Sequence, residues 1–461
     1  MHFEHFVDEG LAQKSYLIGC EDTGEAIVID PRRDIDVFLR VAAANDLRIT
    51  RVTETHIHAD YLSGTREFQA ATGVEVLLSG EGGARWQYEF EHTALHGGDT
   101  ISVGNLRLDV LHLPGHTPET IGFVLYDPPR GPEPVMVFTG DSVFVGDVGR
   151  PDLLEKTTDD RDAAVRGARN LWKSIQRLRE LPDYVMMWPA HGAGSACGKS
   201  LGSVPMSTIG YELATNWAFR VQDENRFVEE LLQGQPETPY YFSEMKSRNR
   251  TGPPVLGRHP APPRLTADEV ADLLDSAQIV DVRSRYAFAG GHIPGSLGIP
   301  LSPSLSNWAG WMLAYDRPIV LVAADHEVAA VVTALIRVGL DTIVGYLDSV
   351  EPWVDSGRLV ARTRQVDAAE FLANRDAYTV LDVRSQSEFA EGHLEGAHHV
   401  YTGHLLREAD RIPEGRPLLV HCKAGYRSMV AASALERMGI DDVVVLGGGY
   451  DALERARSSR A

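Results

Sequence analysis

Histidine and aspartate residues recur at the ends of four apolar runs in the first half of this chain. These segments are His56-x-His58-x-Asp60, Pro114-Gly115-His116, Thr139-Gly140-Asp141 and Pro189-Ala190-His191. Imidazole and carboxylate groups are common ligands of transition metals. Loops at the ends of strands in one rigid sheet can bring residues that are distant in sequence onto one ion. A single histidine in a loop would be weak support, but the four segments together predict a metal site.

The stretch Thr55–Tyr61 bears on the number of metal ions. It matches the metal signature His-x-His-x-Asp-His except at the last position, where Tyr61 replaces a histidine. A phenol is protonated near neutral pH and has no imidazole nitrogen, so a second divalent ion would lose a ligand. The sequence therefore favours one metal ion.

A reactive cysteine is predicted near the end of the chain. The segment Val420–Ser428 leaves an apolar strand and enters a helix, which places Cys422 at the helix N-terminus. Backbone amides there lower the pKa of a thiol and bind anions such as a persulfide sulfur or the sulfonate of thiosulfate. Lys423, Gly425 and Arg427 are the neighbours expected to contact such a substrate. A structural role for Cys422 fits less well, because an apolar core cysteine would not have these neighbours.

The elements that position these residues are expected to form several domains, because 461 residues exceed one ordinary core. Residues 1–245 alternate short apolar runs with helix-like segments, which indicates one α/β domain. Residues 246–264 are rich in proline and arginine and are predicted to form a semi-extended linker.

The rest of the chain repeats itself at a spacing of about 100 residues. Ile279–Arg283 and Gly291–Gly295 match Val380–Arg384 and Gly392–Gly396. Each copy continues with a buried-strand run and a helix of small residues, which predicts two compact doubly wound α/β units at residues 265–360 and 361–461.

The first repeat lacks the cysteine. Val322 or Ala323, depending on one gap, takes the position of the nucleophile. Asp325 and Glu327 also reverse the charge of this loop, which would repel sulfur anions. We therefore expect residues 265–360 to serve as a scaffold or docking surface.

Composition limits the partners and the compartment. The net charge of −21 disfavours nucleic acid and anionic membranes as partners. Three cysteines are too few for a disulfide framework, which favours a reducing, cytoplasmic environment. No targeting segment and no apolar run of bilayer-spanning length is found.

Residues 1–245 resemble the metallo-β-lactamase fold, an αββα sandwich with a metal site at one edge of two facing sheets. Within that superfamily the motifs resemble those of the persulfide dioxygenases, whose single iron(II) is held by residues that correspond to His56, His116 and Asp141. The resemblance implies a set of residues that surround these ligands without binding the metal: His58, Asp60, Tyr61 and His191. Two histidines and one carboxylate leave open positions for O₂ and a sulfur substrate, with zinc as a substitute metal.

The alternative is a two-zinc thioester hydrolase of the glyoxalase II type. In that arrangement Asp60, His191 and a bridging Asp141 hold a second ion that helps generate hydroxide. Tyr61 is the main difficulty, although a bound water could replace the lost ligand.

Two further positions in this domain have alternative roles. Gly149-Arg150-Pro151-Asp152 resembles a segment of the same enzymes, in which Arg150 either binds a substrate carboxylate or forms an ion pair with Asp152. Cys197 is either packed in a tight loop or relays sulfur, and Lys199 would favour its thiolate.

The loop from Cys422 to Arg427 resembles that of the rhodaneses. Its spacing is Cys-x₄-Arg, whereas cysteine phosphatases use Cys-x₅-Arg, so sulfur is favoured over phosphate. The whole chain resembles a persulfide dioxygenase fused to an inactive and an active rhodanese. The implied fold class is α/β, with the αββα sandwich followed by two doubly wound α/β domains.

The resemblance implies that one iron(II) per chain oxidises a low-molecular-weight thiol persulfide with O₂ to sulfite. Cys422 would exchange sulfane sulfur with sulfite or thiosulfate, stabilised by Arg427 and the loop amides. The thiol carrier, the direction of transfer and the oligomeric state, including a homo-oligomer, stay open. A persulfide-binding sulfur carrier is the alternative from a different functional class.

Overall fold

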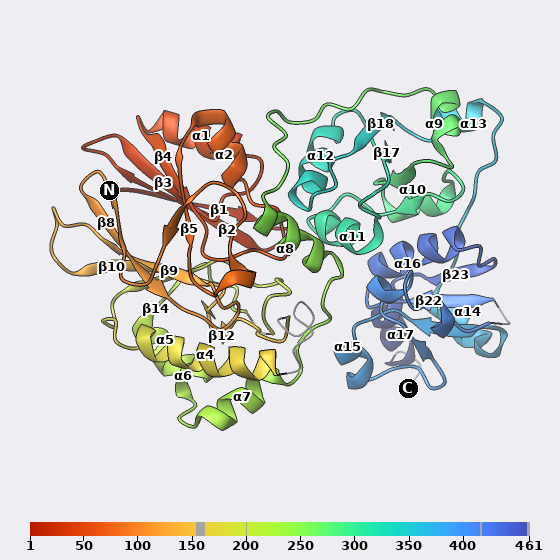
Figure 1. Ribbon diagram of the computed structural model, residues 1–461. Coiled ribbons are helices and arrows are strands. Elements are labelled where there is room, and N and C mark those ends of the chain that lie inside the picture. The colour runs from red at the N-terminus through yellow and green to blue at the C-terminus, as the bar shows by residue number, and fades with distance from the viewer. Residues whose placement is uncertain (154–161, 200, 415–416, 459–461) are drawn as a thin grey trace. The chain divides into compact units, whose positions relative to one another are not determined.

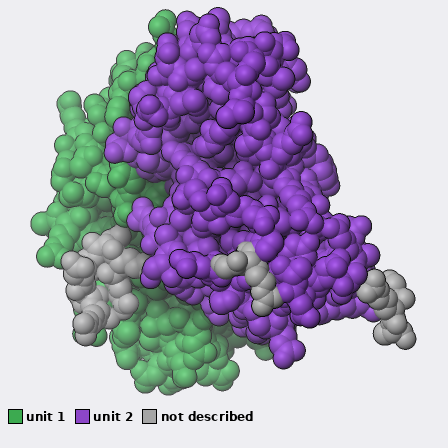
Figure 2. Space-filling model, turned by 90° about the vertical axis from the view of Figure 1, so that its right-hand side faces the viewer, with its two compact units in different colours: residues 1–259 green, residues 260–461 purple. Residues whose placement is uncertain are grey.

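The computed structural model describes residues 1–153, 162–199, 201–414 and 417–458. The chain forms two compact units, Met1–His259 and Pro260–Ala461, which Figure 2 colours separately. No helix in these described ranges combines the length and the apolar character needed to cross a membrane.

The first unit contains two six-stranded sheets, with strand orders β1-β2-β3-β4-β5-β6 and β14-β13-β10-β9-β8-β7. The strands of the first sheet are β1 (His2–Asp8), β2 (Gln13–Cys20), β3 (Glu25–Ile29), β4 (Arg48–Thr53), β5 (Glu75–Ser79) and β6 (Thr93–Leu95). Those of the second sheet are β7 (Thr100–Val103), β8 (Leu106–His112), β9 (Ile121–Tyr126), β10 (Pro134–Gly140), β13 (Met186–Pro189) and β14 (Ser207–Thr208). A two-stranded ribbon is formed by β11 (Val143–Phe144) and β12 (Asp147–Val148).

The two sheets pack face to face, and their inner strands, such as β3 and β10, are buried on both faces. In β3, Ile27 and Ile29 join the core between the sheets, whereas Val28 faces the other way into the core beneath the helices. In β10, Phe138 lies between the sheets and Val137 lies in the outer core. Alternate side chains of a strand point to opposite faces, so buried residues at successive positions require a covering layer on each side.

Helices provide the outer layers (Figure 1). Over the first sheet lie α1 (Asp36–Ala44) and α2 (Thr65–Thr72), whose Phe38 and Phe68 share a core with Val28. Over the second sheet lie α4 (Ala163–Leu178), α5 (Ile209–Thr215), α6 (Trp217–Arg220) and α7 (Glu224–Leu232). The four layers confirm the predicted αββα sandwich.

Helix α8 (Tyr241–Thr251) runs through residue 245, at which the sequence analysis placed the end of the first domain. Its Asn249 side chain donates hydrogen bonds to the carbonyl oxygens of His58 (2.8 Å) and Tyr61 (2.7 Å), and it accepts one from the Ser63 amide (3.0 Å). The helix is polar and buries few residues, so its sequence lacks the apolar period that predicts a helix. Long-range hydrogen bonds therefore attach this segment to the first unit.

The second unit contains two parallel sheets, with strand orders β16-β15-β17-β18 and β19-β23-β22-β20-β21. The strands of the first of these sheets are β15 (Gln278–Asp281), β16 (Leu297–Gly298), β17 (Ile319–Val322) and β18 (Ile343–Leu347). Those of the other are β19 (Arg364–Val366), β20 (Thr379–Asp382), β21 (His398–His399), β22 (Leu418–His421) and β23 (Val443–Leu446). Both central strands, β17 and β22, are buried at every position, as expected for parallel strands covered on both faces.

The helices of the first repeat are α9 (Ala267–Leu273), α10 (Arg285–Gly290), α11 (Leu305–Met312), α12 (Val328–Arg337) and α13 (Glu351–Asp355). Those of the second repeat are α14 (Ala368–Ala373), α15 (Gln386–Glu391), α16 (Tyr426–Arg437) and α17 (Gly449–Ser458). With the parallel sheets, they confirm the two predicted doubly wound α/β units.

The repeated Asp-Val-Arg motif has the same structural role in both repeats. Arg283 binds the carboxylate of Asp281 and the carbonyl oxygen of Gly291. Arg384 binds Asp382 and the carbonyl of Gly392 in the same way. The motif thus connects a central strand to the turn that follows the next helix.

The two repeats share one hydrophobic core. Phe288 and Ala289 of α10 pack in a cluster with residues of β22 and α16, including Val420 and Leu435. A buried aromatic ring contributes about 1.5–3 kcal/mol through its removal from water. The first repeat therefore stabilises the repeat that contains Cys422.

Replacing Asn249 with alanine should lower the free energy of unfolding of the first unit by about 2–4 kcal/mol, because buried backbone groups would lose their partners. Urea unfolding of the full chain measures this difference. Asn45→Ala is a matched control, since the Asn45 side chain donates only to the Val41 carbonyl at an exposed helix end; it should cost less than about 1 kcal/mol. Equal losses in the two variants would contradict the anchoring role of Asn249.

Candidate functional site

The predicted metal-binding segments meet at one edge of the sandwich in the first unit. His56 and His58 follow β4, His116 follows β8, Asp141 follows β10 and His191 follows β13. All five side chains are buried. The order of the strands in the two sheets brings these loops together, although they are separated by up to 135 residues in sequence (from 56 to 191).

His56, His116 and Asp141 form a compact group whose ligand atoms all lie within 4.8 Å of one another. The Nε2 atoms of His56 and His116 are 3.8 Å and 3.6 Å from Asp141 Oδ2. Apart from the Cys197 thiol, no side chain in the part of the chain that the structure describes donates a hydrogen bond to the Asp141 carboxylate. Because a buried charge without partners is costly unless it is paired or coordinates a metal, this donor set fits a metal ion.

Hydrogen bonds fix the tautomers of both histidines. The Thr55 hydroxyl donates its one hydrogen to Asp30 Oδ2 (2.9 Å), so it must accept the bond from His56 Nδ1 (3.0 Å). His116 Nδ1 lies 3.0 Å from the carbonyl oxygen of Arg150, which can only accept. Each ring therefore keeps its hydrogen on Nδ1, and the Nε2 lone pairs face Asp141.

Burial keeps these two rings neutral. It lowers the pKa of His56 well below its usual range and lowers the pKa of His116 to about 3, and the charge of Lys246 acts in the same direction on both. Neutral imidazole is the form that binds a metal.

His58 is held in a different state. Its Nε2 donates to Asp30 Oδ1 (3.0 Å), which also accepts from the Thr55 amide (2.7 Å). Burial opposes the charge on the ring, but Asp30 outweighs this effect and raises the pKa of His58 to about 9. Asp30 thus favours the charged form of His58, and the His58 ring lies beside the His56 ring without belonging to the group of His56, His116 and Asp141.

A second group of donors lies next to the first. One ligand atom from each of Asp60, His191 and Cys197 lies within 4.8 Å of the others. His191 Nε2 is 3.5 Å from Asp60 Oδ2 and also 3.5 Å from Asp141 Oδ1. Among the described residues, no hydrogen bond reaches either oxygen of Asp60 or either ring nitrogen of His191. This neighbouring position has donors for a second cation, with Asp141 between the two groups.

In the second unit, Cys422 lies between β22 and α16. The Gly425 amide donates to Cys422 Sγ (3.1 Å), and the Ser428 hydroxyl lies 3.6 Å from the same sulfur. Gly425 has φ +99°, a left-handed conformation that glycine adopts without strain. The loop therefore turns back over the sulfur and directs an amide at it.

Arg427 is already engaged by a carboxylate. Its guanidinium donates two hydrogen bonds to Glu388 of α15, at 2.5 Å and 2.7 Å. Partial burial would raise the pKa of Glu388, but the bonds from Arg427 outweigh it and lower that pKa to about 2. Lys423, in contrast, is exposed and forms no ion pair with any described residue.

Comparison with known proteins assigns the family. The family model for the metallo-beta-lactamase superfamily matches residues 8–191, and the model for the rhodanese-like domain matches residues 266–356 and 367–456. The crystal structure of a metallo-beta-lactamase from Staphylococcus aureus subsp. aureus COL is 42% identical, with a TM-score of 0.71, over 75% of this chain and 98% of that chain. The chain belongs to the metallo-β-lactamase superfamily. Its second unit contains two rhodanese-like domains.

Curated relatives of the metallo-β-lactamase domain include two kinds of enzyme. Hydroxyacylglutathione hydrolase of Maricaulis maris is 32% identical over 51% of this chain and 80% of the relative. Persulfide dioxygenase ETHE1, mitochondrial, of Bos taurus is 29% identical over 38% of this chain and 63% of the relative. The chain spans 60–63% of the length of three such relatives. The predicted resemblance to a dioxygenase-type metallo-β-lactamase domain fused to two rhodanese domains is confirmed.

Tyr61 of the metallo-β-lactamase domain is fully buried and lies outside both groups of donors. Its hydroxyl is 3.3 Å from the Asp30 carbonyl oxygen, and its ring packs on His58 with centroids 4.6 Å apart. Burial raises the pKa of Tyr61 well above its usual range, so the phenol stays neutral. Tyr61 therefore stands at the sequence position of the missing histidine, and it acts as a packing residue.

Arg150 lies next to His116, at the edge of the sandwich where the candidate metal-binding residues meet. Its side chain is buried, binds Asp152 through two hydrogen bonds (2.8 Å and 2.6 Å) and also donates to the Ala196 carbonyl. Its own carbonyl accepts from His116. Of the two alternatives for Arg150, these contacts favour the internal ion pair, because the guanidinium is enclosed and its donors are used.

Gly149 allows this loop to close. A Cβ atom at Gly149 would lie 1.8 Å from the Asp141 carbonyl oxygen and 3.1 Å from His116 Cβ. The two ligand loops therefore approach each other across a residue that has no side chain.

Cys197 differs from the expectation of a thiolate favoured by Lys199. Burial, together with Asp141 and Asp60, raises the pKa of the Cys197 thiol well above its usual range. The Lys199 ammonium instead donates to the Glu230 carbonyl. The thiol lies beside Asp60 and His191, and its raised pKa favours the protonated form unless a cation replaces its hydrogen.

Three residues near the candidate site, Asp30, Glu119 and Lys246, were missed by the sequence analysis. Asp30 follows β3 in the same strand-end pattern as the ligands, and this signal could have found it. Glu119 accepts a hydrogen bond from the Ile57 amide (2.9 Å) and so holds the backbone between the two histidines. Lys246 lies beyond the predicted end of the domain; its ammonium is 4.0 Å from the Trp86 ring centroid, and burial lowers its pKa to about 8.

The sheet registers identify the counterpart of Cys422 in the first rhodanese-like domain. Asp281 pairs with Val322 in the first repeat, as Asp382 pairs with His421 in the second. Ala323 therefore occupies the position of Cys422, and it is fully buried.

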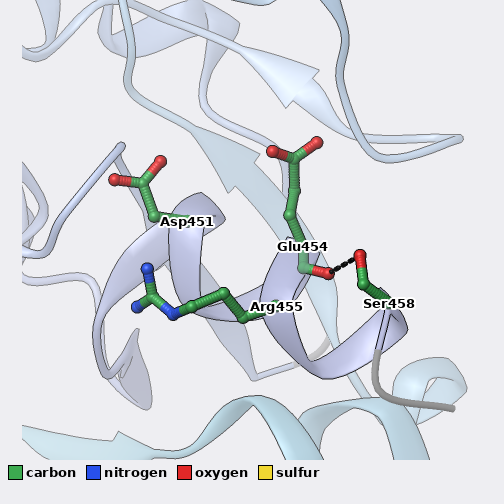
Figure 3. Close-up of a pocket in the computed structure, with 4 residues that line it drawn as sticks. All are labelled: Asp451, Glu454, Arg455 and Ser458. Carbon is green, nitrogen blue, oxygen red and sulfur yellow. Dashed lines mark hydrogen bonds between the residues drawn. The ribbon is translucent and has the colours of Figure 1, made fainter.

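A surface hollow of about 570 Å³ on α17 is separate from this chemistry. It is lined by Asp451, Glu454, Arg455 and Ser458, whose side chains project from the helix without converging on one point (Figure 3). The Ser458 hydroxyl donates to the Glu454 carbonyl within the helix. The hollow therefore offers no assembled binding site.

Glu388→Gln should lower the free energy of unfolding of the second unit by about 1–2 kcal/mol at neutral pH, because it breaks the pair with Arg427. The pKa of Glu388 is depressed from 4.5 to about 2, so this stabilisation is present above about pH 4.5 and is lost as the pH falls toward 2. Urea unfolding of both proteins across this range should show the difference shrinking.

The exposed Glu391, on the same helix, provides the control, and Glu391→Gln should change stability by less than about 0.5 kcal/mol at every pH. A Glu388→Gln effect that does not depend on pH would contradict the ion pair.

Proposed function

We propose that the metallo-β-lactamase domain oxidises low-molecular-weight thiol persulfides with O₂ at one iron(II) ion, and that Cys422 transfers sulfane sulfur to or from thiosulfate. The observation that supports this proposal is the combination, in one chain, of a buried two-histidine, one-carboxylate group and a cysteine loop of the rhodanese type. The two chemistries share sulfane sulfur as their intermediate. The name of the ETHE1 relatives, persulfide dioxygenase, agrees with the first step.

His56, His116 and Asp141 would hold the iron. An iron(II) ion bound by two histidines and one carboxylate would supply open positions for O₂ and an anionic persulfide. The protein supplies the orientation of the ligands, since Thr55 and the Arg150 carbonyl fix the Nδ1 hydrogens. Burial of the site excludes water. This water would otherwise compete with the substrate and allow reactive sulfur species to escape.

Cys422 performs the transfer as a nucleophile. Its thiolate attacks the outer sulfur of thiosulfate, a Cys422 S–S bond forms, the S–S bond of thiosulfate breaks, and sulfite leaves with the electron pair. The reverse attack by sulfite on the cysteine persulfide regenerates the thiolate and gives thiosulfate. The Gly425 amide, which points at the sulfur, stabilises the negative charge on it in both directions.

A second candidate function is thioester hydrolysis with two metal ions. The group formed by Asp60, His191 and Cys197 favours it, because Cys197 offers a donor at the position for which Tyr61 provides none. The name of the relatives called hydroxyacylglutathione hydrolase points in the same direction. In this alternative Asp141 would lie between both ions.

Metal analysis of anaerobically purified protein should find one iron per chain. The full chain loaded with iron should then consume O₂ in the presence of glutathione persulfide and should leave lactoylglutathione intact. Two metal ions per chain together with hydrolysis of lactoylglutathione would favour the hydrolase. No O₂ uptake by the iron-loaded protein would exclude the dioxygenase.

Cys422→Ser should abolish sulfur exchange with thiosulfate, with a loss of at least about 100-fold, because the hydroxyl cannot form the persulfide. O₂ uptake with glutathione persulfide should persist, since that step belongs to the first unit. Cys20→Ser is the control for loss of a buried thiol, and it should retain both activities. If thiosulfate exchange survives in Cys422→Ser, the sulfurtransferase assignment is wrong.

A further inference from the structure

We propose that the cysteine-free rhodanese-like domain contributes a substrate-binding residue to the site at Cys422. This residue is Arg285, and its ligand is the anionic sulfur-oxygen group of the sulfur donor or acceptor, the sulfonate of thiosulfate or free sulfite. The inference rests on the proposed sulfur transfer at Cys422. It goes beyond that function, because it assigns part of the site to a domain that lacks the nucleophile.

Arg285 lies directly against the cysteine loop. It is the first residue of α10, and its Nη1 donates a hydrogen bond to the Ala424 carbonyl (2.8 Å). A Cβ atom at Gly425 would be only 2.9 Å from this nitrogen. Because the Gly425 amide itself donates to Cys422 Sγ, the guanidinium lies beside the backbone turn that holds the reactive sulfur.

The charges around the loop leave Arg285 available for an anion. Both terminal nitrogens of Arg427 are bound to Glu388, so its charge is offset within the fold. Arg285 makes no ion pair with a carboxylate of any described residue, and its Nη2 donates to the neutral hydroxyl of Tyr286 (2.9 Å). Arg285 and the exposed Lys423 are therefore the uncompensated cations of the loop. A planar guanidinium is well suited to sulfur-oxygen anions, since it donates parallel hydrogen bonds to two oxygens.

A second contact from the first repeat holds the other side of the loop. The Tyr426 hydroxyl donates to the Pro300 carbonyl (3.0 Å), and the Ser302 hydroxyl donates to Tyr426 (3.1 Å). Together with the core shared by Phe288 and α16, these bonds fix α10 relative to Cys422. Arg285 can therefore bind substrate in a defined geometry, although it lies 137 residues before the cysteine (422 minus 285).

The chemistry of transfer gives such a residue a specific role. The leaving sulfite, or the attacking sulfite in the reverse direction, is a dianion close to the Cys422 sulfur. A cation that contacts this anion stabilises its binding in the ground state in both directions of transfer. The loop amides instead stabilise negative charge on the sulfur itself. Loss of Arg285 should thus weaken binding of the anion more than it slows the chemical step.

The test uses the full chain and its transfer of sulfur from thiosulfate to cyanide. Arg285→Gln should raise the KM for thiosulfate about tenfold, as for loss of one charge-assisted hydrogen bond, with kcat changed less than about twofold. Arg285→Lys should recover part of the loss because it keeps the charge. Arg362→Gln is the matched control: Arg362 is exposed in the same unit, its side chain forms no hydrogen bond or ion pair with a described residue, and its removal changes the net charge equally.

A binding assay without turnover separates this inference from the proposed function. Sulfate should protect Cys422 of the wild-type protein against a small neutral alkylating reagent, and about tenfold more sulfate should be needed for Arg285→Gln. Protection by sulfate that is lost only in Arg285→Gln supports the site even if thiosulfate exchange is absent, a result that would overturn the sulfurtransferase alone. Equal KM values and equal protection in Arg285→Gln and Arg362→Gln would overturn the role of Arg285. A fall in kcat shared by Arg285→Gln and Arg285→Lys, with KM unchanged, would also overturn the proposal. Such a result would show that Arg285 only stabilises the cysteine loop and does not bind the substrate.

Discussion

Buried carboxylates without hydrogen-bond partners are the physical constraint around which the first unit is built. Asp141 and Asp60 lie at the edge of the two sheets, and among the described residues the Cys197 thiol beside Asp141 is the one side-chain donor near their oxygens. Burial raises the pKa of each to about 6, which shows how unfavourable their charges are without a cation. The strands, the glycine at 149 and the bonds from α8 all hold these groups together. The fold thus keeps an unfavourable arrangement that a metal ion would stabilise.

Another buried carboxylate, Asp30, distinguishes the two histidines of the segment His56–His58. Asp30 accepts the hydrogen bonds of Thr55 and His58 and raises the pKa of His58, whereas burial lowers the pKa of the neighbouring His56. Two histidines separated by one residue therefore have opposite roles. The difference comes from which of them lies within reach of a buried carboxylate, and Arg150 orients the ring of His116 through its backbone alone.

The second unit contains a rhodanese-like domain without a cysteine at the position of the nucleophile, packed against the domain that has one. Ala323 stands where Cys422 stands in the other repeat, and the loop around it is acidic. The domain nevertheless packs Phe288 into the core of its neighbour and places Arg285 and Ser302 against the cysteine loop. These contacts agree with the expectation that residues 265–360 serve as a scaffold.

The sequence by itself determined the elements and residue types whose signals are local. Strand-end histidines, the cysteine before a helix and the internal repeat are all visible within short segments, because strand periodicity and loop chemistry depend on neighbouring residues. Only the tertiary structure decided the partners of those residues. Asp30 meets His58 across 28 residues, Asn249 meets Tyr61 across 188, and Arg285 meets Ala424 across 139. Contacts at such separations follow from strand order and domain packing, and therefore the pKa shifts, the burial of Cys197 and the contact of Arg285 with the cysteine loop could not be obtained from spacing alone.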